Sequence, residues 1–320
     1  MFSVVIPLYN KSQYVSKAIR SVLSQTFLDY ELIVVDDGST DDSLERLAGI
    51  VDKRLKVITQ ANAGVSAARN KGVQYSKYRY VAFLDADDWW DSHFLAGIRD
   101  LIIGFPEAAL YGTSYYTVKN GRNQPADIGL EPYFQAGYID YFKVYAANFW
   151  VPINCSFVVV EKSAFEHAGG FRTALKFGED FDLWVRLALV RKVAYLNKCL
   201  AFSNQDVETG GRALGMHKAW QRKEHVIFNL DSFAEAEQQD PALKFLLDGL
   251  RVRSLIGFYL TCQHPEAVKS ILKKINFEKQ PFLYRFIYRW PKPLVDFYFQ
   301  TKETGSYIKQ TLLRIYRAIN

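Results

Sequence analysis

The stretch YVAFLDADDWWD, residues 80–91, runs from apolar residues directly into four carboxylates: Asp85, Asp87, Asp88 and Asp91. Its apolar half predicts a buried strand. Two carboxylates about 4 Å apart repel by roughly 4 kcal/mol at an effective dielectric of 20, so a strand end that gathers acids favours a bound cation. Capping of a helix after residue 91 is the alternative, which we adopt for Asp91 and favour for Asp88. Capping does not explain Asp85 and Asp87.

Strands and helices alternate through the first hundred residues. The strand patterns cover 2–8, 31–37, 55–60 and 80–85, and the helix patterns cover 12–25, 39–50 and 64–75. Ser12 is the expected N-cap of the first helix. Continuous apolar strands that alternate with helices predict an α/β fold with a parallel sheet covered on both faces.

The pattern is less regular beyond residue 108. Strands are expected at 109–118 and 155–160, and helices at 137–149, 162–171 and 178–190. Residues 204–217 are polar and glycine-rich, which predicts a loop, and helical patterns broken by prolines continue to the end. We therefore expect a first domain at 1–205 with parts at about 1–110 and 110–205, a linker at 206–217 and a helical region at 218–320.

Polar residues follow each of the first four strands: PLYN at 7–10, DDGS at 36–39, QANAG at 60–64 and DADD at 85–88. The carboxyl ends of parallel strands share one edge, where open α/β sheets bind ligands. Turn chemistry explains any one set, but four sets at one edge predict a shared crevice. Asp85 and Asp87, at i and i+2, lie on the same side of an extended strand, and their oxygens suit Mg²⁺ or Mn²⁺.

Several motifs in order resemble those of the family 2 glycosyltransferases of GT-A fold. They are SVVIPLYN, LIVVDDGSTDDS, NAGVSAARNKG, FLDADD, GGF and GEDFDLWVRLA, and they cover about residues 2–205. The resemblance implies an inverting enzyme whose mostly parallel sheet is flanked by helices. The remaining residues have no such match and form a C-terminal helical extension.

The resemblance also implies a site for a nucleoside-diphosphate sugar. Its residues would be Pro7, Tyr9, Asn10, Asp36, Asp37, Ser39, Arg69, Asp85 and Asp87. The first three line the nucleotide pocket, and Asp37 contacts the base from the loop that it shares with Asp36 and Ser39. Arg69 faces the nucleotide and its phosphates. Asp85 and Asp87 form the DxD motif, with Asp87 as the direct ligand of Mn²⁺ or Mg²⁺ and Asp85 nearer the ribose.

On the acceptor side, Asp180 matches the general base of the family, with Glu179 beside it. From the residues alone, acids at a helix N-terminus are better explained by capping; the resemblance reverses this preference for Asp180. Gly169 and Gly170 would allow close backbone approach near the acceptor. Trp184 lies four residues beyond Asp180 and either stacks on acceptor sugar or belongs to the core.

The implied reaction moves a sugar to an acceptor hydroxyl, with UDP as the family's commonest nucleotide. The acceptor would be a saccharide or lipid-linked saccharide in surface-polysaccharide synthesis. Arg212 and His217 flank the glycine-rich loop, which in similar enzymes closes over the diphosphate; solvated loop residues are the favoured interpretation. The alternative for the whole chain is a non-catalytic nucleotide-sugar-binding or scaffold protein of the same fold.

Two other enzyme classes lack their motifs. A dinucleotide-binding dehydrogenase needs GxGxxG after the first strand, where this chain has PLYNKSQ. A sugar nucleotidyltransferase needs a glycine-rich, arginine-containing loop near its N-terminus, and this chain has none there.

The last part of the chain is basic and aromatic. Residues 211–320 hold 18 Lys and Arg against 10 Asp and Glu, within a chain of formal net charge +6. The segment 281–320 mixes aromatic and basic residues, which suits either peripheral contact with a membrane or packing on the chain itself or on a second copy in a homo-oligomer. No nucleic-acid-binding motif is present, so we expect no nucleic-acid partner.

Several features predict a cytoplasmic protein. The N-terminal apolar run is only one strand long and lacks a basic region before it, unlike a signal peptide. No apolar run reaches the roughly 18 residues of a spanning helix. Cys155, Cys199 and Cys262 lie far apart in apolar surroundings and are expected to be buried thiols in a reducing compartment.

Overall fold

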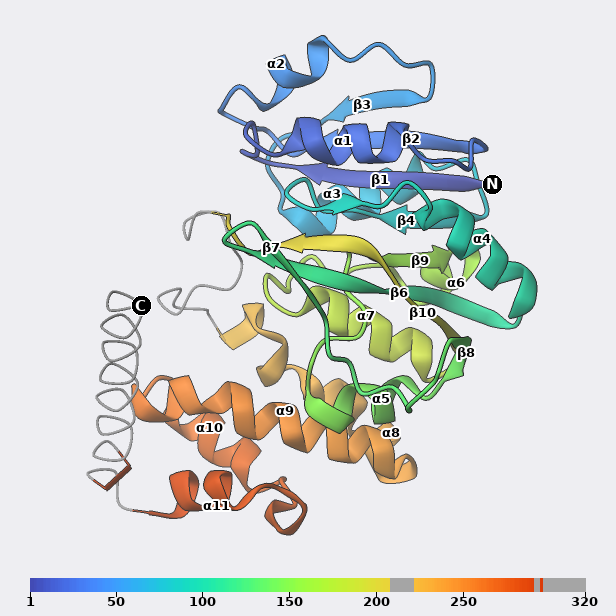
Figure 1. The fold of residues 1–320 in the computed structure, drawn as a ribbon. Coiled ribbons are helices and arrows are strands. Elements are labelled where there is room, and N and C mark those ends of the chain that lie inside the picture. The colour runs from blue at the N-terminus through green and yellow to red at the C-terminus, as the bar shows by residue number, and fades with distance from the viewer. Residues whose placement is uncertain (208–221, 291–293, 296–320) are drawn as a thin grey trace, which may run out of the picture. The chain divides into compact units, whose positions relative to one another are not determined.

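The computed structural model describes residues 1–207, 222–290 and 294–295 (Figure 1). The chain divides into two compact units, Met1–Leu246 and Leu247–Asn320. This boundary lies beyond the expected linker at 206–217, because the chain from residue 222 still packs within the first unit. The backbone N–H groups of Lys176 and Phe177 donate to the carbonyl of Glu224 over 2.8 and 3.1 Å.

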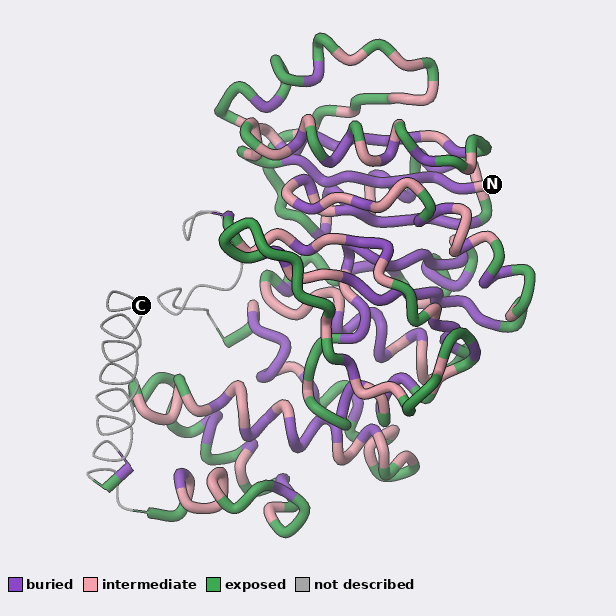
Figure 2. The backbone as a smooth tube through the Cα atoms, in the orientation of Figure 1, coloured by how far each residue is buried: buried purple, intermediate pink, exposed green. Residues whose placement is uncertain are grey.

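Four parallel strands form the first half of a sheet in the order β3–β2–β1–β4. They are β1 (Phe2–Leu8), β2 (Tyr30–Asp36), β3 (Leu55–Thr59) and β4 (Tyr80–Phe83). The helices between them are α1 (Val15–Leu23), α2 (Ser43–Ala48) and α3 (Val65–Gln74). β1 and β4 are buried along their whole length, whereas the edge strand β3 is largely exposed (Figure 2). The predicted strand–helix alternation is confirmed.

The sheet continues as a mixed sheet in the order β4–β9–β6–β10–β5. The added strands are β5 (Trp89–Trp90), β6 (Ala108–Lys119), β7 (Arg122–Pro125), β8 (Ala136–Ile139), β9 (Val158–Glu161) and β10 (Lys192–Asn204). β9 is antiparallel to both β4 and β6, and β10 is parallel to β6. β7 and β8 extend the sheet by pairing with β6 and β10. The α/β class is therefore confirmed, with parallel pairing through β4 and mixed pairing beyond it.

Helices cover both faces of this sheet (Figure 1). α1 and α4 (Phe94–Gly104) lie on one face, and α3, α6 (Lys162–His167) and α7 (Glu179–Ala188) lie on the other. Phe83 of β4 points to the second face, where its ring lies 5.4 Å from that of Phe171. α3 packs directly on β1, since a Cβ added to Gly72 would lie 2.2 Å from a methyl group of Val5.

Several element boundaries differ from the prediction, and three of the differences move a cap or the start of an element. α1 begins at Val15, so Ser12 is not its N-cap; the N–H of Ser12 donates instead to the Asp41 carboxylate over 3.0 Å. Residues 137–139 belong to β8, and α5 (Tyr141–Asn148) begins only after the cap Asp140. Likewise β9 begins at Val158 instead of residue 155.

Residues 222–290 are mainly helical, as predicted. The short elements η2 (Arg222–Glu224), η3 (Val226–Phe228), η4 (Leu230–Phe233) and α8 (Ala234–Gln239) belong to the first unit, and α9 (Pro241–Leu260) crosses the boundary. The second unit adds α10 (Pro265–Leu272), η5 (Phe277–Lys279) and α11 (Phe282–Arg289). α11 buries Ile287, and the Tyr288 hydroxyl donates to the Val252 carbonyl over 2.8 Å. Most of the expected aromatic tail, at 291–293 and 296–320, lies outside the described residues.

Within the described part of the chain, every helix is too short or too polar to cross a bilayer.

Candidate active site

The loops after β1 and β2 are joined to each other. Asn10, in a left-handed conformation with φ 51°, accepts the Thr40 N–H at its side-chain oxygen over 2.8 Å. The Asn10 N–H donates to the Ser39 hydroxyl over 3.2 Å. Pro7 is buried in β1, and the side chain of Tyr9 is 45% exposed at the strand end. The predicted meeting of the two loops is therefore present, and the nucleotide roles of these residues remain predictions.

Asp36 and Asp37 are both buried at the end of β2. The Asp36 carboxylate accepts the Ser39 N–H over 3.3 Å. Asp37 accepts the N–H groups of Ala63 and Gly64 over 2.9 and 2.8 Å, which orders the loop before α3. Contact of Asp37 with a nucleotide base remains a prediction, but its carboxylate has a structural task that the sequence did not reveal.

Arg69 of α3 links two acids that are far apart in the chain. Its side chain is 4% exposed, and its two terminal nitrogens donate to Asp85 over 2.7 Å and to Glu179 over 2.9 Å. It also lies 5.3 Å from the ring of Phe171. Both terminal nitrogens of Arg69 thus contact carboxylates, so Arg69 positions Asp85 and Glu179, and its expected role toward the nucleotide phosphates remains a prediction.

Asp87 has a cationic neighbour that the sequence analysis missed. The ammonium of Lys11 lies 2.5 Å from Oδ2 of Asp87. Burial and the charge of Asp85 raise the pKa of Asp87, and the Lys11 charge opposes this rise. The only local signal was a basic residue directly after the PLYN turn, which does not by itself point to an acid far along the chain.

Asp88 is buried and accepts the Asn204 N–H over 2.7 Å, which joins the end of β10 to the acids. Burial, and then the charges of Asp87 and Asp85, raise its pKa well above the usual range. The interpretation of Asp88 as a helix cap is therefore wrong. Asp91 does not cap α4 either: the N-cap is His93, and the Asp91 carboxylate accepts the His93 N–H over 2.9 Å in the turn before the helix.

The carboxyl end of β4 offers a donor set that suits a divalent cation. Asp85 and Asp87 keep partly exposed carboxylates, with side chains 33% and 20% exposed. No group of three His, Cys, Asp or Glu residues within the described ranges is arranged to hold a metal ion. Two carboxylates leave coordination positions for phosphate oxygens and water, which is how Mg²⁺ is usually held at nucleotide sites. The residues thus fit a cation that binds together with a diphosphate.

Asp180 lies in the first turn of α7, directly after Glu179. Its carboxylate accepts the N–H of Phe181 over 2.7 Å. Burial, and then the charge of Glu179, raise the pKa of Asp180 to about 7, although Arg69 opposes the rise. A carboxylate with a pKa near neutrality is matched to accepting a proton at physiological pH.

Gly169 and Gly170 form the turn between α6 and α7. Both have positive φ, 79° and 65°, and a Cβ added to Gly170 would lie 2.9 Å from the side-chain oxygen of Asn70. Asn70 also accepts the Phe171 N–H over 3.0 Å, so the turn is held against α3 beside Arg69. This backbone requirement explains both glycines, and their closeness to an acceptor remains a prediction.

Trp184 is fully buried, and its ring lies 5.9 Å from that of Phe171. Stacking of Trp184 on an acceptor sugar is therefore wrong for this structure, because no face of the indole reaches the surface. Asp182, in contrast, is 1% exposed and pairs with both Arg172 and Arg186 over 2.7 Å. It fixes the first turn of α7, and with it the place of Asp180.

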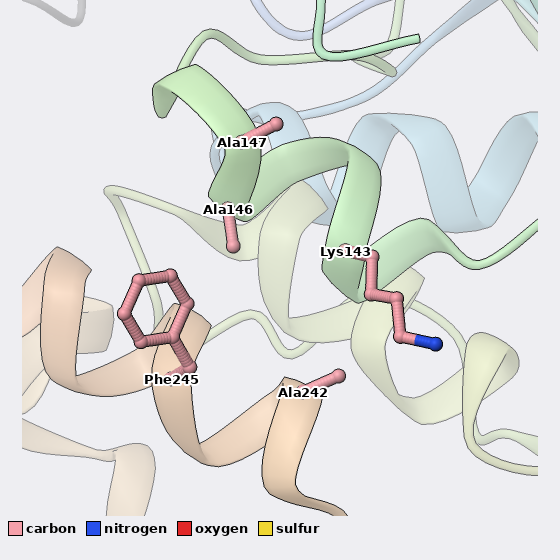
Figure 3. Close-up of a pocket in the computed structure, with 5 residues that line it drawn as sticks. All are labelled: Lys143, Ala146, Ala147, Ala242 and Phe245. Carbon is pink, nitrogen blue, oxygen red and sulfur yellow. The ribbon is translucent and has the colours of Figure 1, made fainter. Parts of the chain in front are cut away.

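Other predicted features lie elsewhere. Arg212 and His217 are outside the described residues. Cys155 is buried as expected, but Cys199 is only half-buried and Cys262 is exposed, so the expectation of three buried thiols is wrong. Figure 3 shows a pocket between α5 and the start of α9, lined by Lys143, Ala146, Ala147, Ala242 and Phe245. It contains none of the predicted site residues.

The fold and the acids at its strand ends define an α/β protein with a candidate site at the carboxyl ends of its parallel strands. The sequence model of glycosyl transferase family 2 matches residues 3–166, which is half of the chain. The chain belongs to this family.

Individual relatives agree with this assignment. GlyA of Streptococcus pneumoniae, a glycosyltransferase, is 30% identical over 207 residues, 62% of this chain and 30% of GlyA. TuaG of Bacillus subtilis, a putative teichuronic acid biosynthesis glycosyltransferase, is 29% identical over 206 residues, 63% of this chain and 77% of TuaG. The chondroitin synthase of Pasteurella multocida aligns over only 25% of its own length. The chain thus spans less than a third of GlyA and of the chondroitin synthase.

Solved structures show the same fold. The crystal structure of S. aureus TarS 1-349 in complex with UDP-GlcNAc has a TM-score of 0.58 at 18% identity, covering 85% of this chain and 90% of that one. The predicted fold class is confirmed.

Proposed function

We propose that this protein is a metal-dependent, inverting glycosyltransferase. It would move a sugar from a UDP-sugar to a hydroxyl of a saccharide or lipid-linked saccharide in surface-polysaccharide synthesis. The observation that carries the proposal is the chain of contacts Asp85–Arg69–Glu179, which ties the acids after β4 to the first turn of α7 beside Asp180. The UDP-GlcNAc in the TarS structure and the teichuronic acid pathway named for TuaG support the donor and the product class.

The donor would bind over the carboxyl ends of the parallel strands. We assign the nucleotide to the joined loops after β1 and β2, where Tyr9 exposes its ring and Asn10 holds the two loops together. Asp87 and Asp85 would hold Mn²⁺ or Mg²⁺, which when bound neutralises negative charge on the leaving diphosphate. Arg69 keeps the Asp85 carboxylate in place through its 2.7 Å contact.

Asp180 would act as the general base. Its pKa of about 7 leaves a large fraction ionised at neutral pH while keeping enough basicity to take a proton. The acceptor oxygen attacks the anomeric carbon, its proton passes to Asp180, and the bond to the diphosphate breaks with its electron pair leaving on the diphosphate. One displacement inverts the anomeric centre.

A donor screen tests this proposal. The protein is mixed with a panel of nucleotide sugars, with and without Mn²⁺, and both its thermal unfolding and the release of free nucleotide are measured. We expect a UDP-sugar to raise the unfolding temperature in the presence of Mn²⁺ and to be turned over slowly, because a ligand that binds only the folded state stabilises it. A panel that produces neither shift nor turnover contradicts the proposal.

We also propose that segment 281–320 contacts the membrane surface. Phe282 and Trp290 at the ends of α11 are 75% and 46% exposed, and Arg289 between them is exposed as well. Aromatic and basic side chains together suit the headgroup layer of an anionic leaflet. The protein should co-sediment with vesicles containing phosphatidylglycerol and less so with neutral vesicles. The double variant Phe282→Ser, Trp290→Ser should lose this preference, and unchanged sedimentation would contradict the proposal.

A further inference from the structure

Lys11 is held in place by the loops that surround it. Its N–H donates to the Ser43 hydroxyl over 2.9 Å, and its carbonyl accepts the N–H groups of Tyr14 and Val15 over 2.9 and 3.0 Å. From this fixed backbone the side chain reaches the end of β4, where the ammonium lies 2.5 Å from Oδ2 of Asp87. A residue of the first loop therefore contacts the carboxylate assigned to the metal.

The two DxD carboxylates are thus paired with basic side chains that differ in how easily they can move. Asp85 pairs with Arg69, which is 4% exposed and anchored by a second carboxylate. Asp87 pairs with Lys11, whose side chain is 16% exposed. An ammonium on a flexible four-carbon side chain can move to another anion at little cost, whereas a buried guanidinium that is hydrogen-bonded to two carboxylates cannot.

We propose that Lys11 is an internal counter-ion that competes with the divalent cation for Asp87 and transfers to the donor diphosphate when cation and nucleotide bind together. This inference rests on the proposed function. A cation alone must displace the ammonium from Oδ2 and leave it without that partner. When the diphosphate is present, the displaced ammonium finds phosphate oxygens, which lysine binds as a point charge. Cation and nucleotide then bind cooperatively.

The experiment measures cation and nucleotide binding separately. Free Mn²⁺ is counted by electron paramagnetic resonance during titration of the nucleotide-free protein, and UDP binding is measured by calorimetry at saturating Mn²⁺. We expect Lys11→Gln to bind Mn²⁺ alone about fivefold more tightly, the effect of removing roughly 1 kcal/mol of competing ion pair. The same variant should bind UDP about tenfold more weakly, since a charge-assisted hydrogen bond is lost.

Three further variants separate this role from a structural one. Lys11→Met keeps the aliphatic stem and should behave like Lys11→Gln. Lys11→Arg keeps the charge and should stay closer to the wild type. Lys77→Gln removes a lysine whose side chain is 62% exposed and should change neither affinity. Circular dichroism confirms that each variant is folded, and Lys11→Met replaces Lys11→Gln if the latter is not.

The inference predicts opposite effects of Lys11→Gln on the two affinities: Mn²⁺ alone binds more tightly, and UDP binds more weakly. If Lys11→Gln and Lys11→Met weaken the binding of both Mn²⁺ and UDP, or change neither, the inference is overturned while the proposed function stands. If the wild type binds UDP with no dependence on Mn²⁺, the inference and the metal dependence fail together. If the wild type binds neither Mn²⁺ nor UDP, the proposed function itself is contradicted.

Discussion

Arg69 joins two acidic segments of this protein, the end of β4 and the start of α7, and the acids of the two segments have different partners. At the end of β4, Asp85 and Asp87 each face a basic side chain, Arg69 and Lys11. At the start of α7, Glu179 contacts the other terminal nitrogen of Arg69, and Asp180 accepts the backbone N–H of Phe181. The acids of the first segment therefore have positively charged partners, whereas burial and the charge of Glu179 raise the pKa of Asp180 to about 7.

One arginine, Arg69, contributes to this difference, because it contacts an acid in each segment. Arg69 forms ion pairs with Asp85 and Glu179, and the charge of Glu179 contributes to the raised pKa of its neighbour Asp180. Pairs of acids whose environments separate their protonation behaviour are typical of sites that combine charge stabilisation with proton transfer. Changes to either segment should therefore have distinct effects.

The largest effect is expected at Asp180. Asp180→Asn should reduce turnover by at least about 10²-fold, because the acceptor hydroxyl loses its base. UDP binding at saturating Mn²⁺ should stay unchanged, since the donor residues are untouched. Initial rates and calorimetry measure the two quantities. Wild-type turnover in this variant would show that Asp180 is not the general base. The different surroundings of the two acidic segments would then have no role in catalysis.

The link between the segments is broken by Arg69→Met. We expect the free energy of unfolding to fall by about 2–3 kcal/mol, because two carboxylates lose a buried partner. The loss is smaller at Asp85, because its carboxylate is partly exposed and water can solvate it. Turnover should fall about tenfold as well. Arg79→Met is the control: Arg79 is 67% exposed, and its partner Glu161 keeps Arg191, so a change below about 0.5 kcal/mol is expected. Urea unfolding that shows equal losses in both variants would argue against a special role for Arg69.

The pH dependence of turnover sharpens the comparison. The active form of Asp180 is ionised, so turnover should rise with pH through a midpoint of about 7 and be about tenfold below its plateau at pH 6. Glu179→Gln removes the neighbouring charge that raises this pKa, so the midpoint should move to lower pH. A midpoint that stays in place or moves upward in Glu179→Gln would show that Glu179 does not set the pKa of Asp180.

The smallest effect concerns stability. Because the folded-state pKa of Asp180 is raised above its unfolded value, the folded protein loses stability as the pH rises from about 4 to about 7. Asp180→Asn has no such titration and should be more stable than the wild type at pH 8, by about 1 kcal/mol after allowance for partial exposure. Urea unfolding at pH 8 and pH 5 measures the difference, which should be smaller at pH 5. A variant less stable than the wild type at pH 8 would mean that Asp180 also holds the first turn of α7.

Much of the fold was predictable because its signals are local. The apolar runs that became β1, β2 and β4 and the helices between them have the periods of their elements, and each is followed by residues typical of turns. The error at Ser12 has a tertiary cause, since its N–H is drawn to Asp41 in the neighbouring loop. The strand partners beyond β4 were not predictable either, because β6, β9 and β10 pair out of sequence order.

The sequence by itself determined the family, the α/β class and the acids at the ends of the strands, because motif order, periodicity and turn chemistry are written in neighbouring residues. Only the tertiary structure decided which charge meets which. Lys11 and Asp87 are 76 positions apart, and Arg69 and Glu179 are 110 positions apart. Burial also depends on how the chain packs. Packing buries Trp184 completely, and burial is the main reason for the raised pKa of Asp180. Electrostatic energies depend on distance and solvent access in space, which separation along a chain does not specify.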